Sequence, residues 1–159
     1  MIQILKQPKI RIQPDRAREV DRIPKQIREA FRGVLTWHKP WPITLLGEAG
    51  RGKTSAALCM CDLIRTACYF THLQLVDAVF EEDKRIWDAI SQKQLVVIDD
   101  IQPPGNLVEA KALRKALSYR EQGRMVGTIV ISDGSEHTMS RLPADLQHKL
   151  QAGSVIHVR

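Results

Sequence analysis

The stretch Gly47-Glu-Ala-Gly-Arg-Gly-Lys-Thr54 constrains the fold more than any other part of this sequence. It fits the pattern G-x-x-x-x-G-K-[ST], and it follows an apolar run at 43–46 and precedes a helical segment that begins near Lys53. Glycines let backbone N–H groups approach a phosphate closely, and the start of a helix favours an anion. The strand, loop and helix together predict a phosphate-binding loop. The alternative is a glycine-rich turn without a ligand.

Within this loop we expect different side chains to bind the phosphates and the metal ion. Lys53 would reach the β- and γ-phosphates of a nucleotide, and the Thr54 hydroxyl would ligate Mg²⁺. The loop therefore predicts a bound nucleotide and Mg²⁺. The residues expected to surround the nucleotide are Gly47, Glu48, Ala49, Gly50, Arg51, Gly52, Lys53, Thr54 and Ser55.

Two later apolar segments also end in polar residues. Leu95-Val-Val-Ile-Asp-Asp100 places two acids after a buried strand, at the edge where open α/β sheets bind ligands. Asp99 is the candidate to hold Mg²⁺ through water, and Asp100 the candidate to orient or deprotonate an attacking water. A helix cap is the alternative for this pair. The run at 128–133 ends in Ser132-Asp133, which would help to position water or would form only a turn.

The order of elements predicts an α/β fold. Short apolar runs near 43–46, 68–71, 95–98, 126–131 and 154–158 read as strands. Helical spacing predicts helices near 24–35, 53–66, 75–80, 86–90, 107–122 and 142–151. This alternation favours a five-stranded parallel sheet covered on both faces. We expect residues 1–40 to form a basic N-terminal arm and helix, with an extended segment at 1–14, and residues 41–159 to form the core.

The charge is concentrated at the N-terminus. Residues 1–40 contain ten Lys and Arg side chains against four acids, which accounts for the whole formal net charge of +6. Such a segment attracts phosphate backbones, and we expect it to contact DNA; a solvated helix face is the alternative. No apolar run is long enough for a membrane-spanning helix, and no signal peptide is evident, so we expect a cytoplasmic protein with no membrane contact. Cys59, Cys61 and Cys68 are expected to be buried free thiols.

These motifs together resemble the core of AAA+ ATPases, which are P-loop NTPases with a three-layer α/β fold. The Ile98-Asp-Asp-Ile101 sequence narrows the resemblance to the DnaA/DnaC-like group. The spacing of the motifs, which include the final segment at 142–150, is most similar to the DnaC/IstB-like branch of helicase loaders and transposition helpers, related to DnaA-type initiators. The resemblance covers about residues 15–159. It implies that Asp99 and Asp100 are the Walker B acids and that Asp133 occupies the sensor 1 position, where the family usually has Asn.

The resemblance also shows departures from the family pattern. Lys149 stands where an arginine finger is usual, and a lysine lacks the bidentate fork of arginine; Arg141 is a possible substitute. The sequence ends at Arg159, where relatives continue, so we expect the core to lack the C-terminal helical lid. The segment 21–24 is placed by the resemblance where an N-terminal linker touches adenine.

Three functions follow as hypotheses. The first is an ATP-dependent switch in DNA replication or transposition that forms nucleotide-dependent homo-oligomers and acts on a replicative helicase or transposase, with Asp100, Asp133 and Lys149 as its catalytic residues. The second is a non-hydrolysing ATP-binding scaffold, which Asp133 and Lys149 favour. The third is a small-molecule kinase, but no Arg-rich lid segment follows the strands as that activity requires.

Overall fold

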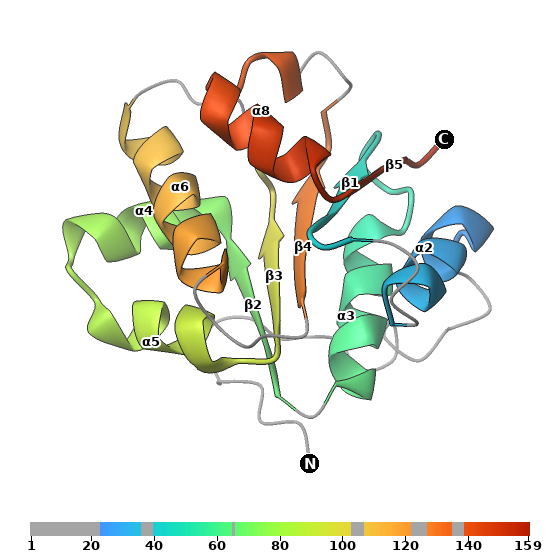
Figure 1. Ribbon diagram of the computed structural model, residues 1–159, viewed down its shortest axis with the longest axis horizontal. Coiled ribbons are helices and arrows are strands. Elements are labelled where there is room, and N and C mark those ends of the chain that lie inside the picture. Colours follow the sequence, from blue (N-terminus) through green and yellow to red (C-terminus); the bar gives the residue numbers. More distant parts are fainter. Residues whose placement is uncertain (1–22, 36–39, 65, 103–106, 122–126, 135–138) are drawn as a thin grey trace.

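Five parallel strands form one sheet at the centre of the molecule (Figure 1). The computed structural model describes residues 23–35, 40–64, 66–102, 107–121, 127–134 and 139–159. The strands are β1 (Ile43–Leu46), β2 (Ala67–Thr71), β3 (Leu95–Asp99), β4 (Gly127–Ser132) and β5 (Ser154–His157). The helices are α2 (Lys25–Leu35), α3 (Lys53–Leu63), α4 (His72–Phe80), α5 (Lys84–Gln92), α6 (Leu107–Glu121) and α8 (Ala144–Gln151).

The strand order in the sheet is β2-β3-β4-β1-β5, and every neighbouring pair is parallel. β4 therefore lies between β1, which precedes the glycine-rich loop, and β3, which ends in Asp99. Because all strands run in the same direction, the segments that follow β1, β3 and β4 meet at one edge of the sheet. We refer to this edge as the carboxyl edge and to the opposite one as the amino edge.

Helices cover both faces of the sheet, as Figure 1 shows. α2 and α3 pack on one face through a cluster that includes Ile27, Met60 and the strand residues Ile43 and Val97. α4, α5, α6 and α8 cover the other face. β1, β3 and β4 are buried along their whole length, which explains why their sequences are almost continuously apolar. The prediction of a three-layer α/β fold with a five-stranded parallel sheet is confirmed, and the described residues contain no helical lid.

Some predicted boundaries were wrong. α3 ends at Leu63 rather than near Thr66, because Ile64 already has extended backbone angles, and β2 begins at Ala67. α4 begins at His72, three residues before the predicted start, because Thr71 forms a capping box with Gln74. The cysteines at 59, 61 and 68 are buried free thiols, as predicted. The extended arm predicted at 1–14 lies outside the described residues, as does the basic segment up to residue 22.

A buried arginine joins three elements at the amino edge. Arg120, near the end of α6, is 7% exposed and uses all five of its N–H donors. Its Nε donates to Thr128 Oγ1 at 3.0 Å. Its Nη atoms donate to the carbonyl oxygens of Ile90, Lys93, Gln94 and Gly127 at 2.5–3.0 Å. Burial lowers the pKa of Arg120 to about 10, so the group stays charged at neutral pH.

No helix in the described part of the chain is long and apolar enough to cross a membrane.

Candidate functional site

The glycine-rich loop between β1 and α3 has a backbone that only glycine accommodates well. Gly52, the N-cap residue of α3, has φ 81°, in the left-handed region. Gly47 has φ 144°, and a Cβ atom there would lie 2.2 Å from the carbonyl oxygen of Val158. No side chain caps the N-terminus of α3, so its first N–H groups remain available to a ligand. The loop thus has the backbone features of an anion-binding turn.

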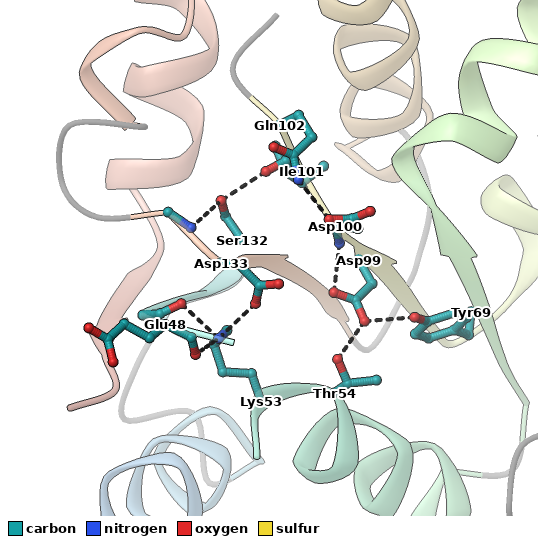
Figure 2. Close-up of polar contacts among 12 residues, drawn as sticks. Glu48, Lys53, Thr54, Tyr69, Asp99, Asp100, Ile101, Gln102, Ser132 and Asp133 are labelled. Atoms are coloured by element: carbon teal, nitrogen blue, oxygen red, sulfur yellow. Dashed lines mark hydrogen bonds and ion pairs between the residues drawn. The ribbon is translucent and has the colours of Figure 1, made fainter. Parts of the chain in front are cut away.

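Lys53 is the buried cation of this loop. Its side chain is 3% exposed, and its ammonium group contacts three oxygens (Figure 2). Nζ donates to the carbonyl oxygens of Gly47 at 2.8 Å and Glu48 at 2.6 Å. It also pairs with Asp133 Oδ1 at 2.9 Å. These contacts match the three donors of an ammonium group. The lysine therefore points across the loop toward the end of β4.

Asp99 is held on the other side of the site by two hydroxyl groups (Figure 2). Its Oδ2 accepts a hydrogen bond from Thr54 Oγ1 at 2.6 Å and another from the Tyr69 hydroxyl at 2.6 Å. Its Oδ1 accepts the backbone N–H of Asp100 at 2.6 Å. Burial, followed by the hydrogen bond to Asp99, raises the pKa of Tyr69 well above its usual value. The phenol is therefore a neutral proton donor at physiological pH.

Asp100 follows directly at the end of β3 and has an unusual backbone conformation. Its φ is 56°, which is uncommon for a residue other than glycine, although Asp tolerates it better than most. The side chain is exposed, and its Oδ1 accepts a hydrogen bond from Gln102 Nε2 at 2.7 Å. Left-handed non-glycine residues cluster at functional sites, where neighbouring contacts hold them. Here the Asp99 carboxylate and Gln102 provide those contacts.

Hydrogen bonds join the carboxyl end of β4 to the segment that follows β3. Ser132 Oγ donates to the carbonyl oxygen of Ile101 at 2.8 Å and accepts the N–H of Gly134 at 3.2 Å. The N–H of Ile101 donates to the carbonyl oxygen of Ile131 at 3.0 Å. The loop after β1 joins this arrangement, because Gly47 donates to the carbonyl oxygen of Gly134 at 3.2 Å. These bonds hold Asp133 opposite Lys53.

The charges at the carboxyl edge fit a divalent cation. Asp133 pairs with the ammonium group of Lys53, and Asp99 and Asp100 add two further carboxylates at the end of β3. The Thr54 hydroxyl and the Asp99 carboxylate are adjacent hard oxygen donors, which are the ligand type that Mg²⁺ prefers. This donor set would hold Mg²⁺ only weakly by itself, because Mg²⁺ usually takes its remaining ligands from water and substrate phosphates.

A cavity of about 740 Å³ opens beside the loop. This volume lies within the range of small-molecule ligand sites. The residues that line it are Leu46, Gly47, Glu48, Arg51, Asp133, Gly134, His157, Val158 and Arg159. Arg51 and Glu48 form an exposed pair at 3.0 Å at its rim. Pro24 approaches the same loop from the other side, since its ring lies 3.5 Å from where a Gly52 Cβ would be.

The structure brings together most of the side chains that the sequence singled out. Lys53, Thr54, Asp99, Asp100 and Asp133 converge at the carboxyl edge (Figure 2). Within the loop, Ala49 and Gly50 are exposed, and Ser55 lies half-buried in the first turn of α3.

Lys149 does not join this group. It lies near the end of α8, where its Nζ pairs with Glu121 Oε2 at 3.1 Å and contacts Ser118 Oγ at 3.4 Å. It also lines a smaller cavity of about 170 Å³ at the amino edge, together with Arg120 and Trp41. Arg141 is exposed in the segment just before α8. A role for Lys149 within its own subunit's site is therefore excluded by its position, and a role in a neighbouring subunit stays a prediction.

Sequence reasoning missed Tyr69. The only signal for it was a hydroxyl-bearing aromatic residue in a strand, Ala67–Thr71, that is otherwise apolar up to its last residue. Its relation to Asp99 depends on β2 and β3 being neighbours in the sheet, with Tyr69 opposite Val97. The spacing of residues along the chain does not show that β2 and β3 are neighbours in the sheet.

Solved structures with the same fold come from replication proteins. DnaA from Aquifex aeolicus bound to AMPPCP aligns with a TM-score of 0.67 at 16% identity, over 86% of this chain and 48% of that one. DnaI aligns at 0.65 and 16% identity, over 84% and 79% of the two chains. The DnaC helicase loader aligns at 0.61 and 18% identity, over 83% and 89%.

These likenesses show that this chain has the fold shared by the DnaA, DnaI and DnaC structures. The chain spans about half the length of the DnaA structures that it matches. No protein-family model matches the sequence, and no curated protein sequence matches it.

Proposed function

We propose that this chain is an ATP-binding AAA+ switch protein that acts in DNA replication or transposition, as a helicase loader or a DNA-targeting helper. The observation that carries the proposal is the convergence of Lys53, Thr54, Asp99 and Asp133 around the uncapped start of α3. The same fold occurs in DnaA bound to AMPPCP, a triphosphate analogue, which supports ATP as the ligand.

The proposed binding step is an exchange of partners at Lys53. The ammonium group now contacts two loop carbonyls and Asp133, and phosphate oxygens of ATP replace some of these acceptors. Such an exchange leaves no donor of the buried cation unpaired, so it avoids a large desolvation penalty. The N–H groups at the start of α3 and the loop add further donors for the phosphates.

Three carboxylates and a hydroxyl group take part in the proposed hydrolysis. Thr54 and Asp99 would hold Mg²⁺, which would supply positive charge against the phosphate oxygens. Asp100 orients or deprotonates the attacking water, and its exposed carboxylate beside Gln102 is free to accept that proton. Asp133 pairs with Lys53, and its carboxylate helps to position the attacking water.

DNA and a protein partner complete the proposal. DnaA is seen in complex with single-stranded DNA, and DnaC is a helicase loader. We assign DNA contact to the basic N-terminal arm at 1–40, of which α2 carries the exposed side chains of Lys25 and Arg28. A replicative helicase or a transposase is the proposed partner, and neighbouring copies of the chain assemble when ATP is bound. Lys149, or Arg141 in its place, acts across that subunit boundary in the cytoplasm.

ATP hydrolysis and oligomer size, measured with and without DNA, test this proposal. The variants to compare are wild type and Asp100→Asn, which keeps the shape of the side chain and removes its basicity. We expect Asp100→Asn to bind ATP normally, to lose about 100-fold or more of the hydrolysis rate, and to accumulate as an ATP-bound oligomer. A protein that stays monomeric under all conditions would count heavily against the switch.

A non-hydrolysing ATP-binding scaffold is the second candidate. The ion pair between Lys53 and Asp133 favours it, because Asp133 places a negative charge where the transferred phosphate would lie. This function predicts stable ATP occupancy with no phosphate release, even when DNA and partner are present.

A further inference from the structure

Tyr69 reaches the proposed metal site from a neighbouring strand. It lies in β2 opposite Val97 of β3, two residues before Asp99, and its ring packs partly buried against the same cluster as Val97. The hydroxyl group extends along β3 to Asp99 Oδ2 at 2.6 Å. A phenylalanine would fill the same apolar space, so packing alone does not explain the hydroxyl group at this position.

The hydrogen bonds of Asp99 leave its carboxylate little freedom. A carboxylate offers about four acceptor positions. Three are filled here, two on Oδ2 by Thr54 and Tyr69 and one on Oδ1 by the N–H of Asp100. The two O–H···O contacts have the short length of charge-assisted hydrogen bonds. Of these three hydrogen bonds, only the one from Tyr69 comes from β2. Without it, the carboxylate would be free to rotate.

We propose that Tyr69 is a positioning residue for the Mg²⁺ site, which fixes the Asp99 carboxylate so that its free oxygen position and the Thr54 hydroxyl face the phosphate loop together. This inference rests on the proposed binding of ATP and Mg²⁺ at this edge. Tyr69 itself contacts neither nucleotide nor metal. Removing partners of this kind typically weakens metal affinity 10–100-fold while the metal's own ligands stay in place.

The test compares the two tyrosines of the chain, Tyr69 and Tyr119. Tyr119 is 36% exposed and stacks on Trp87 away from the site, so Tyr119→Phe removes the same atom and serves as the matched control. ATP affinity is measured for each variant in Mg²⁺ and in EDTA. We expect Tyr69→Phe to keep the EDTA affinity of wild type and to lose about tenfold of the tightening caused by Mg²⁺. Tyr119→Phe should behave as wild type in both.

A spectroscopic readout in wild type supports the comparison even if Tyr69→Phe does not fold. Tyrosine labelled with ¹³C at Cζ gives one signal for each of the two tyrosines, and the Tyr119→Phe variant alone assigns both. Adding ATP with Mg²⁺ should shift the Tyr69 signal more than ATP in EDTA does, and should leave the Tyr119 signal unmoved. An unmoved Tyr69 signal, or a Tyr69→Phe protein with the Mg²⁺ response of wild type, would overturn the inference.

The outcome separates this inference from the proposed function. If wild type binds ATP more tightly in Mg²⁺ and Tyr69→Phe does so equally, only the role of Tyr69 is wrong. If wild type binds no ATP in either condition, the proposed function fails and the role of Tyr69 fails with it.

Discussion

The two edges of the central sheet each hold a buried cation, but the partners of these cations differ. Lys53 at the carboxyl edge is 3% exposed and contacts two loop carbonyls and the half-exposed carboxylate of Asp133. Arg120 at the amino edge is 7% exposed and contacts four backbone carbonyls and one hydroxyl, with no carboxylate among the residues that the structure describes. The partners of Lys53 border a cavity of about 740 Å³ and include one side-chain carboxylate that can move, whereas four of the five partners of Arg120 are backbone carbonyls.

This difference shows that a buried charge by itself does not identify a functional site. Arg120 has no donor left for a ligand, and its acceptors come from the ends of α5, β3 and β4, so its role is to hold these elements together. Lys53 has a flexible side chain and an exchangeable acid partner. We therefore expect changes at Arg120 to affect stability and changes at Lys53 to affect nucleotide binding.

The largest effect is expected for Arg120→Met. The substitution leaves the carbonyl groups of Ile90, Lys93, Gln94 and Gly127 without their donor, so the free energy of unfolding should fall by about 3–5 kcal/mol. Urea denaturation measures this change, and ATP affinity at low temperature should be that of wild type. A loss below about 1 kcal/mol, within the range of surface substitutions, would remove the contrast between the two edges.

Lys53→Ala is expected to have the next largest effect, on binding rather than on stability. Loss of the charged donor should weaken ATP binding by about 2–3 kcal/mol, because hydrogen bonds to charged groups are worth that much. The unfolding free energy should change less than in Arg120→Met, since Asp133 is half exposed and can turn to solvent, and Gly47 and Glu48, whose carbonyls lose their donor, line the open cavity. Lys111→Ala on the exposed side of α6 is the matched control. Equal ATP affinity in Lys53→Ala and wild type would contradict the assignment.

Asp133→Asn should have a smaller effect in the opposite direction. The substitution removes a competitor for Lys53 and a negative charge beside the phosphates. ATP affinity should therefore rise by about 1 kcal/mol, the upper part of the range for exposed ion pairs. Titration with a fluorescent ATP analogue measures this, with Asp145→Asn, which breaks the Arg114 pair elsewhere, as control. Weaker binding in Asp133→Asn would mean that this carboxylate helps to hold the ligand.

Lys149→Ala is expected to have the smallest effect on the isolated subunit. Its pair with Glu121 lies at the amino edge and is partly exposed, so its loss should cost about 0–1 kcal/mol of stability and leave ATP affinity unchanged. If Lys149 acts across a subunit boundary, hydrolysis should fall only at protein concentrations where oligomers form. Arg141→Ala, compared in the same assay, identifies which cation has that role.

The carboxyl edge was largely predictable from the sequence. The loop at 47–54 has a fixed pattern, and apolar runs that end in Asp99 and Asp133 must end at the same side of a parallel sheet. The contact between Lys53 and Asp133 was not predictable, because it depends on β4 lying between β1 and β3. Sequence order does not specify that arrangement.

The amino edge and Tyr69 gave almost no signal in the sequence. Arg120 occurs in a helix rich in charged residues, and only the approach of α5, β3 and β4 makes it buried. The role of Tyr69 was equally unpredictable, because its hydrogen-bond partner, Asp99, lies thirty residues away on the neighbouring strand. Residues whose role depends on pairing between strands are therefore the ones that pattern reasoning misses.

Calorimetric titration of the wild-type chain with ATP in the presence of Mg²⁺ shows whether the carboxyl edge binds a nucleotide. We predict saturable binding of one ATP per chain, weakened when Mg²⁺ is removed. Absence of binding at millimolar ATP, or binding that ignores Mg²⁺, would contradict it.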